Sequence, residues 1–221
     1  MKKNRLEVKD VKYTYQDGQK ANTVLKGVNA EFDGGNLYVI IGESGSGKTT
    51  LISLISALDI LQEGDILFND KSLKNIGNSN FRLNYVNIVF QSYNLINYMT
   101  AKENVDVAID FSGIKKDKNY AYEVLERVGI DASKADRPVL KLSGGEQQRV
   151  AIARCIASDE PILVADEPTG NLDEETEEKI IEIFKSIAKE GKIVIIVSHS
   201  KNVSKHADVI YHMKKGLIEK K

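Results

Sequence analysis

Residues 42–49 combine glycines, a lysine and hydroxyl side chains at a spacing that suits phosphate binding. The segment reads Gly42-Glu43-Ser44-Gly45-Ser46-Gly47-Lys48-Thr49. It fits the pattern G-x-x-x-x-G-K-[ST], in which the glycines let the backbone curl so that its N–H groups point at a polyanion. We expect Lys48 to reach the β- and γ-phosphates of a nucleoside triphosphate, and the Thr49 hydroxyl to bind Mg²⁺.

A pair of carboxylates, Asp166 and Glu167, directly follows the apolar stretch 162–165. Open α/β sheets bind ligands at the carboxyl ends of their strands. We therefore expect Asp166 to hold the Mg²⁺ shell and Glu167 to polarise an attacking water. Adjacent acids at a strand end can also just begin a polar turn, but their pairing with a phosphate loop favours the site.

A third feature is the combination of Ser143 with Gly144 and Gly145. Ser143 is expected to cap a helix, and the two glycines expose backbone N–H groups at the positive end of its dipole. The alternative is a well-capped helix without a ligand. With the phosphate loop, the chain would carry two anion-binding helix ends.

The elements that position these residues follow from the apolar pattern. Short apolar runs at 37–41, 162–165 and 193–197 are typical of buried parallel strands, and Glu174–Ala188 of an amphipathic helix. Two alternating stretches, Leu6–Tyr15 and Val24–Phe32, predict strands at the start of the chain. The helix after the phosphate loop is expected to bury Leu51, Leu54, Ile55 and Leu58. Alternating strands and helices predict an α/β fold with a parallel sheet.

The stretch from about 92 to 142 differs from the rest because it shows no buried parallel strand. It holds a predicted helix that ends at Gly129. The apolar face of this helix comprises Ala121, Val124, Leu125 and Val128. We interpret the stretch as a mainly helical insert.

Composition limits the possible functions. The 31 basic and 32 acidic side chains give a net charge of −1, without the basic excess expected of a nucleic-acid-binding protein. The single cysteine, Cys155, excludes an internal disulfide and fits a reducing compartment. No apolar run is long enough to span a membrane, and the basic start 1–5 lacks the apolar stretch of a signal peptide. We expect a cytoplasmic protein.

One stretch resembles the signature of ATP-binding-cassette (ABC) proteins: Leu142-Ser143-Gly144-Gly145-Glu146-Gln147-Gln148-Arg149. The resemblance covers essentially the whole chain. It implies a P-loop NTPase with a RecA-like parallel core, an N-terminal antiparallel β subdomain and a helical insert. One nucleotide-binding domain would span 1–221, with 1–90 and 145–221 forming the β subdomain and core and about 92–144 the helical subdomain. It also implies a homodimer in which Ser143, Gly144 and Gly145 of one copy face ATP held by the other.

Further residues match the family one by one. Tyr15 resembles the aromatic residue that stacks on adenine, although with Tyr13 nearby it could be an ordinary strand tyrosine. Gln91 matches the glutamine that contacts Mg²⁺ and senses the γ-phosphate, and His199 the histidine that contacts that phosphate. Asp173 resembles the acid that communicates across the dimer, and we expect it also to cap the next helix. The nucleotide-binding set is completed by Gly42, Ser44, Gly45, Ser46, Gly47, Lys48, Thr49 and Thr50.

The chain is most similar to the subgroup that serves lipoprotein release, macrolide or peptide efflux and peptide-antibiotic resistance. The marks of that subgroup are Ala57-Leu58-Asp59, Val89-Phe90-Gln91-Ser92-Tyr93-Asn94-Leu95, Glu103-Asn104-Val105 and Ala165-Asp166-Glu167-Pro168-Thr169-Gly170-Asn171-Leu172-Asp173. The chain departs from the family at four places without losing a catalytic group: Thr50, Asn36-Leu37, Lys215-Gly216, and Ser200, which stands where an acid usually follows the histidine.

The resemblance implies a Mg²⁺-dependent ATPase that drives a separate integral-membrane permease from the inner face of the plasma membrane, with no nucleic-acid partner. The alternative is a cassette ATPase acting on DNA or on the ribosome. DNA-acting cassettes place a long coiled coil between phosphate loop and signature, whereas here 143 − 48 = 95 positions without sustained heptads separate Lys48 from Ser143. Ribosome-acting proteins normally carry two cassettes.

Overall fold

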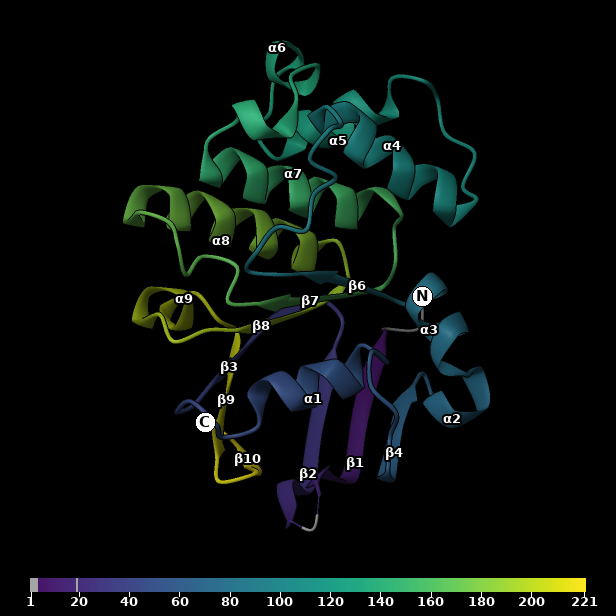
Figure 1. Cartoon of the computed structure of the whole chain (residues 1–221), viewed down its shortest axis with the longest axis vertical. Coiled ribbons are helices and arrows are strands. Elements are labelled where there is room, and N and C mark those ends of the chain that lie inside the picture. Colours follow the sequence, from purple (N-terminus) through teal and green to yellow (C-terminus); the bar gives the residue numbers. More distant parts are fainter. Residues whose placement is uncertain (1–3, 19) are drawn as a thin grey trace.

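The computed structural model of the chain describes residues 4–18 and 20–221. The first three residues, part of the basic start considered above, lie outside the described residues. The molecule is layered along its long axis. Figure 1 shows a group of helices from residues 101–157 at one end, a sheet in the middle, and a second sheet at the other end.

The central sheet has the strand order β10-β9-β3-β8-β7-β6. Its strands are β3 (Asn36–Ile41), β6 (Val86–Val89), β7 (Ile162–Asp166), β8 (Ile193–Val197), β9 (Val209–Lys214) and β10 (Leu217–Lys220). All neighbours pair in parallel except β10, which is antiparallel to β9. The three apolar runs form β3, β7 and β8, which are almost wholly buried because both faces of the sheet are covered. The predicted parallel core is confirmed.

Strand register brings the chemistry to one edge. Ala165 of β7 pairs with Val89 of β6 and with Ile196 of β8, so the segments that follow these three strands leave the sheet at the same level. Residues 91, 166 and 199 lie just beyond this level, and the loop after β3 leaves the sheet beside them. The carboxyl edge of the sheet therefore holds the predicted site.

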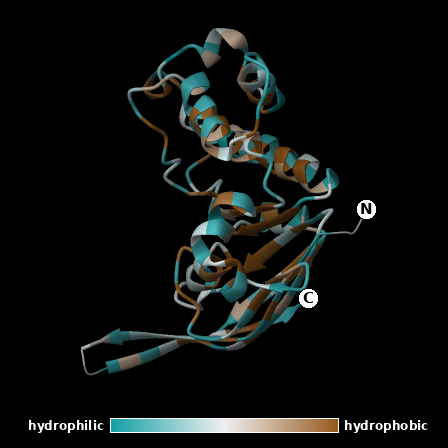
Figure 2. Cartoon of the chain, turned by 90° about the vertical axis from the view of Figure 1, so that its right-hand side faces the viewer, coloured by the Kyte–Doolittle hydropathy of each residue, from teal (hydrophilic) through white to brown (hydrophobic). Residues whose placement is uncertain are grey.

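The second sheet is antiparallel, with the order β2-β1-β4-β5. Its strands are β1 (Arg5–Asp17), β2 (Lys20–Asp33), β4 (Glu63–Phe68) and β5 (Lys71–Ser72). The expected N-terminal antiparallel subdomain is thus present, with two further short strands that the apolar pattern did not indicate. Figure 2 shows that the outer end of the β1–β2 hairpin is mostly hydrophilic, while the strands nearer the centre carry hydrophobic residues.

Helix α1 (Lys48–Ile55) joins the two sheets. It buries Leu51, Leu54 and Ile55 in a hydrophobic cluster that includes residues of both sheets. The expectation that Leu58 extends this face is wrong, because the helix ends at Ile55 and the Leu58 side chain is half exposed. The left-handed backbone at Ala57 (φ 53°) turns the chain away before another helical turn can form. Two short helices follow β5, α2 (Leu73–Ile76) and α3 (Asn78–Asn84).

The helical insert contains α4 (Ala101–Ser112), α5 (Tyr120–Arg127), α6 (Ala132–Ala135) and the 3₁₀ turn η1 (Val139–Lys141). The predicted apolar face of α5 is buried, and Gly129 ends this region with a φ of 74°. α7 (Gly144–Ala157) packs on α4 and α5. One hydrophobic cluster runs from Val124 of α5 through Ile152 of α7 to Val194 of β8. The insert therefore shares its core with the sheet, and the proposed subdomain boundaries stay a prediction.

Two further helices lie on the C-terminal half. α8 (Glu174–Lys189) is one residue longer than expected, and α9 (Lys201–Lys205) follows β8. Within residues 4–18 and 20–221, no helix is both long and apolar enough to cross a bilayer.

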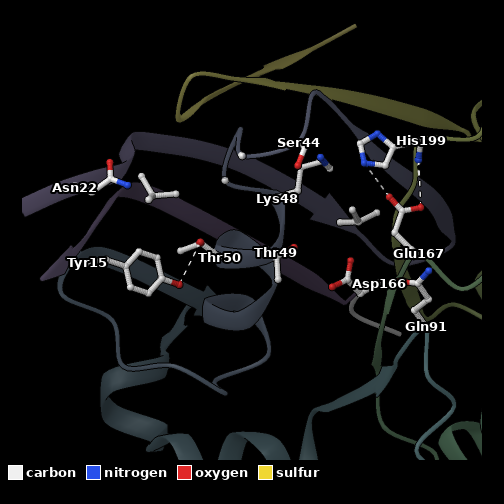
Figure 3. A pocket seen from close by; sticks show the side chains of 14 residues that line it. Tyr15, Asn22, Ser44, Lys48, Thr49, Thr50, Gln91, Asp166, Glu167 and His199 are labelled. Atoms are coloured by element: carbon white, nitrogen blue, oxygen red, sulfur yellow. Dashed lines mark hydrogen bonds and ion pairs between the residues drawn. The ribbon is translucent and has the colours of Figure 1, made fainter. Parts of the chain in front are cut away.

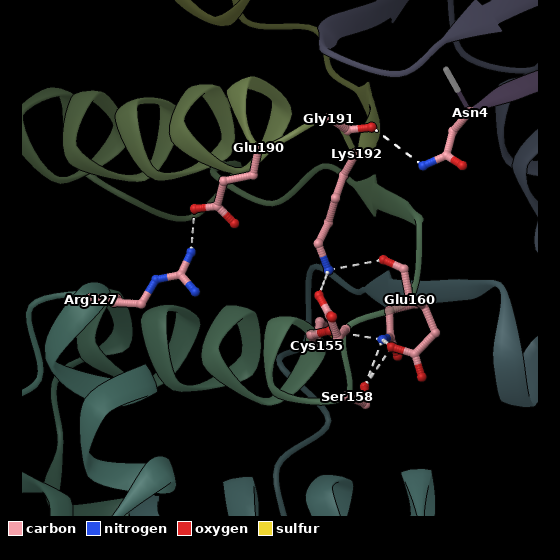
Figure 4. Close-up of polar contacts among 10 residues, drawn as sticks. Asn4, Arg127, Cys155, Ser158, Glu160, Glu190, Gly191 and Lys192 are labelled. Carbon is pink, nitrogen blue, oxygen red and sulfur yellow. Dashed lines mark hydrogen bonds and ion pairs between the residues drawn. The ribbon is translucent and has the colours of Figure 1, made fainter. Parts of the chain in front are cut away.

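Polar contacts join the loops that precede β7 and β8, and join α5 to the end of α8 (Figure 4). The Lys192 ammonium donates to a carboxylate oxygen of Asp159 at 2.8 Å and to the Glu160 carbonyl at 3.0 Å. The Arg127 guanidinium of α5 meets Glu190 at the end of α8 at 2.5 Å, so an ion pair spans the insert and the core.

Candidate nucleotide-binding and hydrolysis site

The phosphate loop lies between β3 and α1, as its motif requires. Two of its glycines are explained by sterics. A Cβ at Gly42 would lie 2.2 Å from the carbonyl oxygen of Met213, and Gly47 caps α1 with a φ of 109°. The loop can curl only because these side chains are absent. Its N–H groups and the N-terminus of α1 together provide an anion-binding end.

Lys48 is held inside the loop. Its side chain is 6% exposed, and its ammonium donates to the carbonyls of Gly42 at 2.8 Å and Glu43 at 3.0 Å. Burial lowers the pKa of Lys48, while the carboxylates of Glu167 and Asp166 act in the opposite direction. Among the described residues, the Lys48 ammonium makes its hydrogen bonds to backbone carbonyls, which it can exchange for phosphate oxygens.

A cavity of about 480 Å³ opens beside the loop. Figure 3 shows side chains from the antiparallel sheet, the loop, β7 and the segment after β8 pointing into it. Of the predicted site residues, it is lined by Tyr15, Ser44, Gly45, Gly47, Lys48, Thr49, Thr50, Gln91, Asp166, Glu167 and His199. Ser46 lines a separate small cavity on the β9 side of the loop.

Tyr15 occupies the end of the cavity away from the acids (Figure 3). Tyr15 is 44% exposed, whereas Tyr13 is 7% exposed and packs edge-on against the Tyr15 ring. Tyr15 is therefore the tyrosine available to a base. Asn22 and Val24 of β2 also line the cavity, and sequence reasoning did not identify them. The hairpin register, in which Asn22 pairs with Tyr15, is the signal that could have found them.

The two acids differ in environment. Burial raises the pKa of Asp166, with a further rise from Glu167 and a lowering by Lys48. Glu167 has a left-handed backbone (φ 47°), and one of its carboxylate oxygens accepts the His199 N–H at 3.3 Å. The other oxygen, Oε1, is buried, lies 3.2 Å from His199 Nε2 and makes no hydrogen bond with the described residues. A carboxylate oxygen without a hydrogen bond keeps a lone pair available, which suits a base that must accept a proton from water.

Thr49, Gln91 and Asp166 line the same part of the cavity (Figure 3). A hydroxyl, an amide carbonyl and a carboxylate are the hard oxygen ligands that Mg²⁺ prefers. Gly170 leaves room for the Gln91 side chain, since a Cβ there would lie 3.1 Å from the amide nitrogen. The residues present therefore fit a Mg²⁺ ion bound with a nucleotide.

The second predicted anion site lies elsewhere. Ser143 caps α7 by accepting the Glu146 N–H at 3.3 Å, and the Glu146 carboxylate accepts the Ser143 N–H at 2.8 Å. This contact is the main cause of the lowered pKa of Glu146. None of Ser143, Gly144 and Gly145 lines the 480 Å³ cavity. The structure thus separates the two halves of the predicted site within one chain.

Asp173 caps α8. Its carboxylate accepts the Thr176 N–H at 3.0 Å and the Thr176 hydroxyl at 2.8 Å, and the N–H contact is the main cause of its lowered pKa. The expected capping role is therefore present. Its role across a dimer stays a prediction.

Comparison with known proteins gives independent evidence for the family of this chain. The family model described as ABC transporter matches residues 25–170. The chain belongs to the ABC transporter family. An uncharacterised ABC transporter ATP-binding protein of Bacillus subtilis (strain 168), YclH, is 45% identical over 215 residues, which is 96% of this chain and 94% of that protein. The macrolide export ATP-binding/permease protein MacB of Pasteurella multocida (strain Pm70) is 35% identical over 96% of this chain, which spans 33% of MacB.

A solved structure of a related protein has the same fold. The ABC cassette MJ0796, a protein of Methanocaldococcus jannaschii, has been solved as a dimer in a post-hydrolysis state bound to ADP and Pi. It matches with a TM-score of 0.87 and 34% identity over 97% of this chain and 98% of that one. The P-loop NTPase fold is confirmed, and the chain is an ABC cassette ATPase that binds ATP.

Proposed function

We propose that two copies of this ABC cassette close around two Mg-ATP molecules and drive a separate integral-membrane permease. One observation carries the proposal. The cavity is lined by the phosphate loop, both acids and His199, but not by Ser143, Gly144 or Gly145. A second copy is the obvious source of that capping helix end. The dimeric MJ0796 cassette bound to ADP and Pi supports this arrangement.

The chemistry assigned to each side chain follows from its surroundings. Glu167 orients and deprotonates the attacking water through Oε1, the buried oxygen that makes no hydrogen bond with the described residues. His199 and Lys48 stabilise the charge that develops on the transferred phosphoryl group. Mg²⁺, held by Thr49, Gln91 and Asp166, would neutralise phosphate charge. Tyr15 stacks on the base.

The permease contact is assigned to the segment after Gln91. Tyr98 is 84% exposed and Leu140 is 62% exposed. Their neighbours are joined, because the Val139 N–H donates to the Met99 carbonyl at 3.0 Å. Exposed apolar side chains on two linked segments suit a helix of a membrane subunit. This contact would place the cassette on the inner face of the plasma membrane. The similarity to the macrolide export protein MacB supports efflux or extraction of an amphipathic, peptide or lipoprotein cargo.

Glu167→Gln tests the proposal. The variant should still bind Mg-ATP and should lose turnover by a factor of about 100 or more, equal to about 2.7 kcal/mol in the barrier, because the amide cannot accept the proton of water. Light scattering with excess Mg-ATP should then show a dimer. Lys48→Ala is the matched control, which should neither bind nucleotide nor dimerise. A Glu167→Gln chain that stays monomeric with bound ATP would contradict the shared site.

A further inference from the structure

Ser200 directly follows His199, and the Ser200 hydroxyl takes part in three hydrogen bonds. It donates to Oε1 of Glu177 at 2.6 Å. It also accepts the backbone N–H groups of Asn202 at 3.1 Å and Val203 at 3.3 Å, which makes Ser200 the N-cap of α9. The segment that carries His199 is therefore fixed through one side chain.

Glu177 is a carboxylate in an unusual place. It lies one turn into α8, is only 8% exposed, and its N–H donates to the Asp173 carbonyl at 2.8 Å. A buried carboxylate is costly unless donors satisfy it, and the Ser200 hydroxyl is a short donor. The cleft around the pair is also lined by Glu174, Lys201 and Lys205.

These contacts form a continuous chain from α8 to the proposed base. Glu177 accepts from Ser200, Ser200 is bonded in sequence to His199, and the His199 N–H donates to Glu167. The backbone at Ser200 is held further, since its N–H donates to the Ser198 hydroxyl at 3.0 Å and Ser198 is 1% exposed. Displacement of residue 200 therefore displaces the histidine backbone.

We propose that Glu177 is a positioning residue, which sets His199 against Glu167 through the Ser200 hydroxyl. This inference rests on the proposed function for the roles of those two catalytic side chains. The first turn of α8, which Asp173 caps, is thereby coupled to His199.

Glu178 provides a matched control. It also ties α8 to α9, because it accepts from the Asn202 amide at 3.2 Å and lies 3.3 Å from His206 Nε2. Both of these partners lie beyond residue 200. Loss of Glu178 therefore weakens the packing of the two helices without removing the hydrogen bond next to His199.

The test compares steady-state ATPase kinetics of Ser200→Ala, Glu177→Ala, the double variant and Glu177→Gln. Each alanine variant should lower kcat about tenfold, with KM for ATP near the wild-type value, because a charge-assisted hydrogen bond is lost but the nucleotide cavity is intact. The kcat of the double variant should equal that of the single variant with the lower kcat, because both substitutions remove the same hydrogen bond. Glu177→Gln keeps an acceptor and should recover most of kcat, and Glu178→Ala should match the wild type.

A structural readout accompanies the kinetics. Hydrogen exchange in residues 198–203 should accelerate in Glu177→Ala but not in Glu178→Ala. Multiplicative losses in the double variant, unchanged kcat in Ser200→Ala, or equal exchange in the two glutamate variants would each overturn the proposal. Failure of the proposed function is separate, since it would show as absent nucleotide-dependent dimerisation in Glu167→Gln while the exchange comparison still decides on Glu177.

Discussion

At the residue scale, the absence of a side chain at Gly145 has two possible reasons. It belongs to the motif assigned to a nucleotide on a second copy, yet it is also needed within one chain. A Cβ at this position would lie 2.5 Å from Cγ2 of Thr176 in α8. Thr176 is β-branched and is held by Asp173, so it has little freedom to move.

Gly145→Ala should therefore lower the unfolding temperature. Alanine normally stabilises a helix relative to glycine by about 1 kcal/mol, whereas overpacking costs about 1–3 kcal/mol, so the clash should dominate. Thr176→Ser removes the methyl group and keeps the hydroxyl, and it should restore the melting temperature when combined with Gly145→Ala. Thermal melts of both single variants and the double variant check this. Equal melting temperatures for Gly145→Ala and the wild type would show that the glycine is not required for packing.

At the scale of elements, α7 is connected to the loop that carries Gln91. Tyr93 and Asn94 follow in that loop with φ values of 59° and 50°, which cost energy for residues other than glycine. The Arg154 guanidinium of α7 donates to both carbonyls, at 3.2 Å and 2.6 Å respectively. The arginine thus stabilises a strained loop and couples it to the helix that Ser143 caps.

Arg154→Gln should release this loop, since a glutamine is too short to reach both carbonyls. Hydrogen–deuterium exchange of residues 92–97 should accelerate, while exchange in the rest of α7 should stay slow because its apolar face is buried. Arg137→Gln is the control, because the Arg137 guanidinium donates within its own segment, to the Ser133 carbonyl at 3.1 Å. Unchanged exchange in residues 92–97 of Arg154→Gln would show that packing alone holds the loop.

At the scale of the whole molecule, the helical layer formed by α4, α5 and α7 shares one hydrophobic core with the central sheet. Cys155 lies at this junction: it is 6% exposed, and its thiol donates to the Ile88 carbonyl of β6 at 3.3 Å. Burial raises the pKa of the Cys155 thiol to about 12 from an ordinary 9.0. The thiol is thus neutral and shielded while the layers stay together.

Cys155 should therefore resist a thiol reagent at pH 8 in the folded protein and react fully in denaturant, which an absorbance assay can follow. The same shift has a consequence for stability. Below pH 9 both states keep the proton, and as pH rises from 9 towards 12 only the unfolded chain loses it, so stability falls. If the thiol reagent labelled Cys155 rapidly in the native protein, this would show that the helical layer separates from the sheet.

The fold could largely be predicted where a local pattern encodes it. The apolar runs of β3, β7 and β8 and the apolar face of α5 were found because burial imposes a period on neighbouring residues. Strand β4 was not found because its segment begins Glu63-Gly64-Asp65 without an apolar run, and it is defined by pairing with the distant β1. Strand β5 has only two residues and is defined by pairing with β4. The end of α1 was misplaced for a similar reason, since a left-handed residue at Ala57 leaves no trace in the apolar spacing.

By itself, the sequence determined the phosphate loop, the acid pair and the capped helix, because each is a contiguous motif whose chemistry depends on adjacent residues. Only the tertiary structure decided that Tyr15 rather than Tyr13 faces the cavity, that Gln91 lies beside Asp166, and that Glu177 reaches Ser200. These contacts depend on strand order and on helix packing between segments far apart in the chain. No local period records such neighbours, since they are selected by how well whole elements pack.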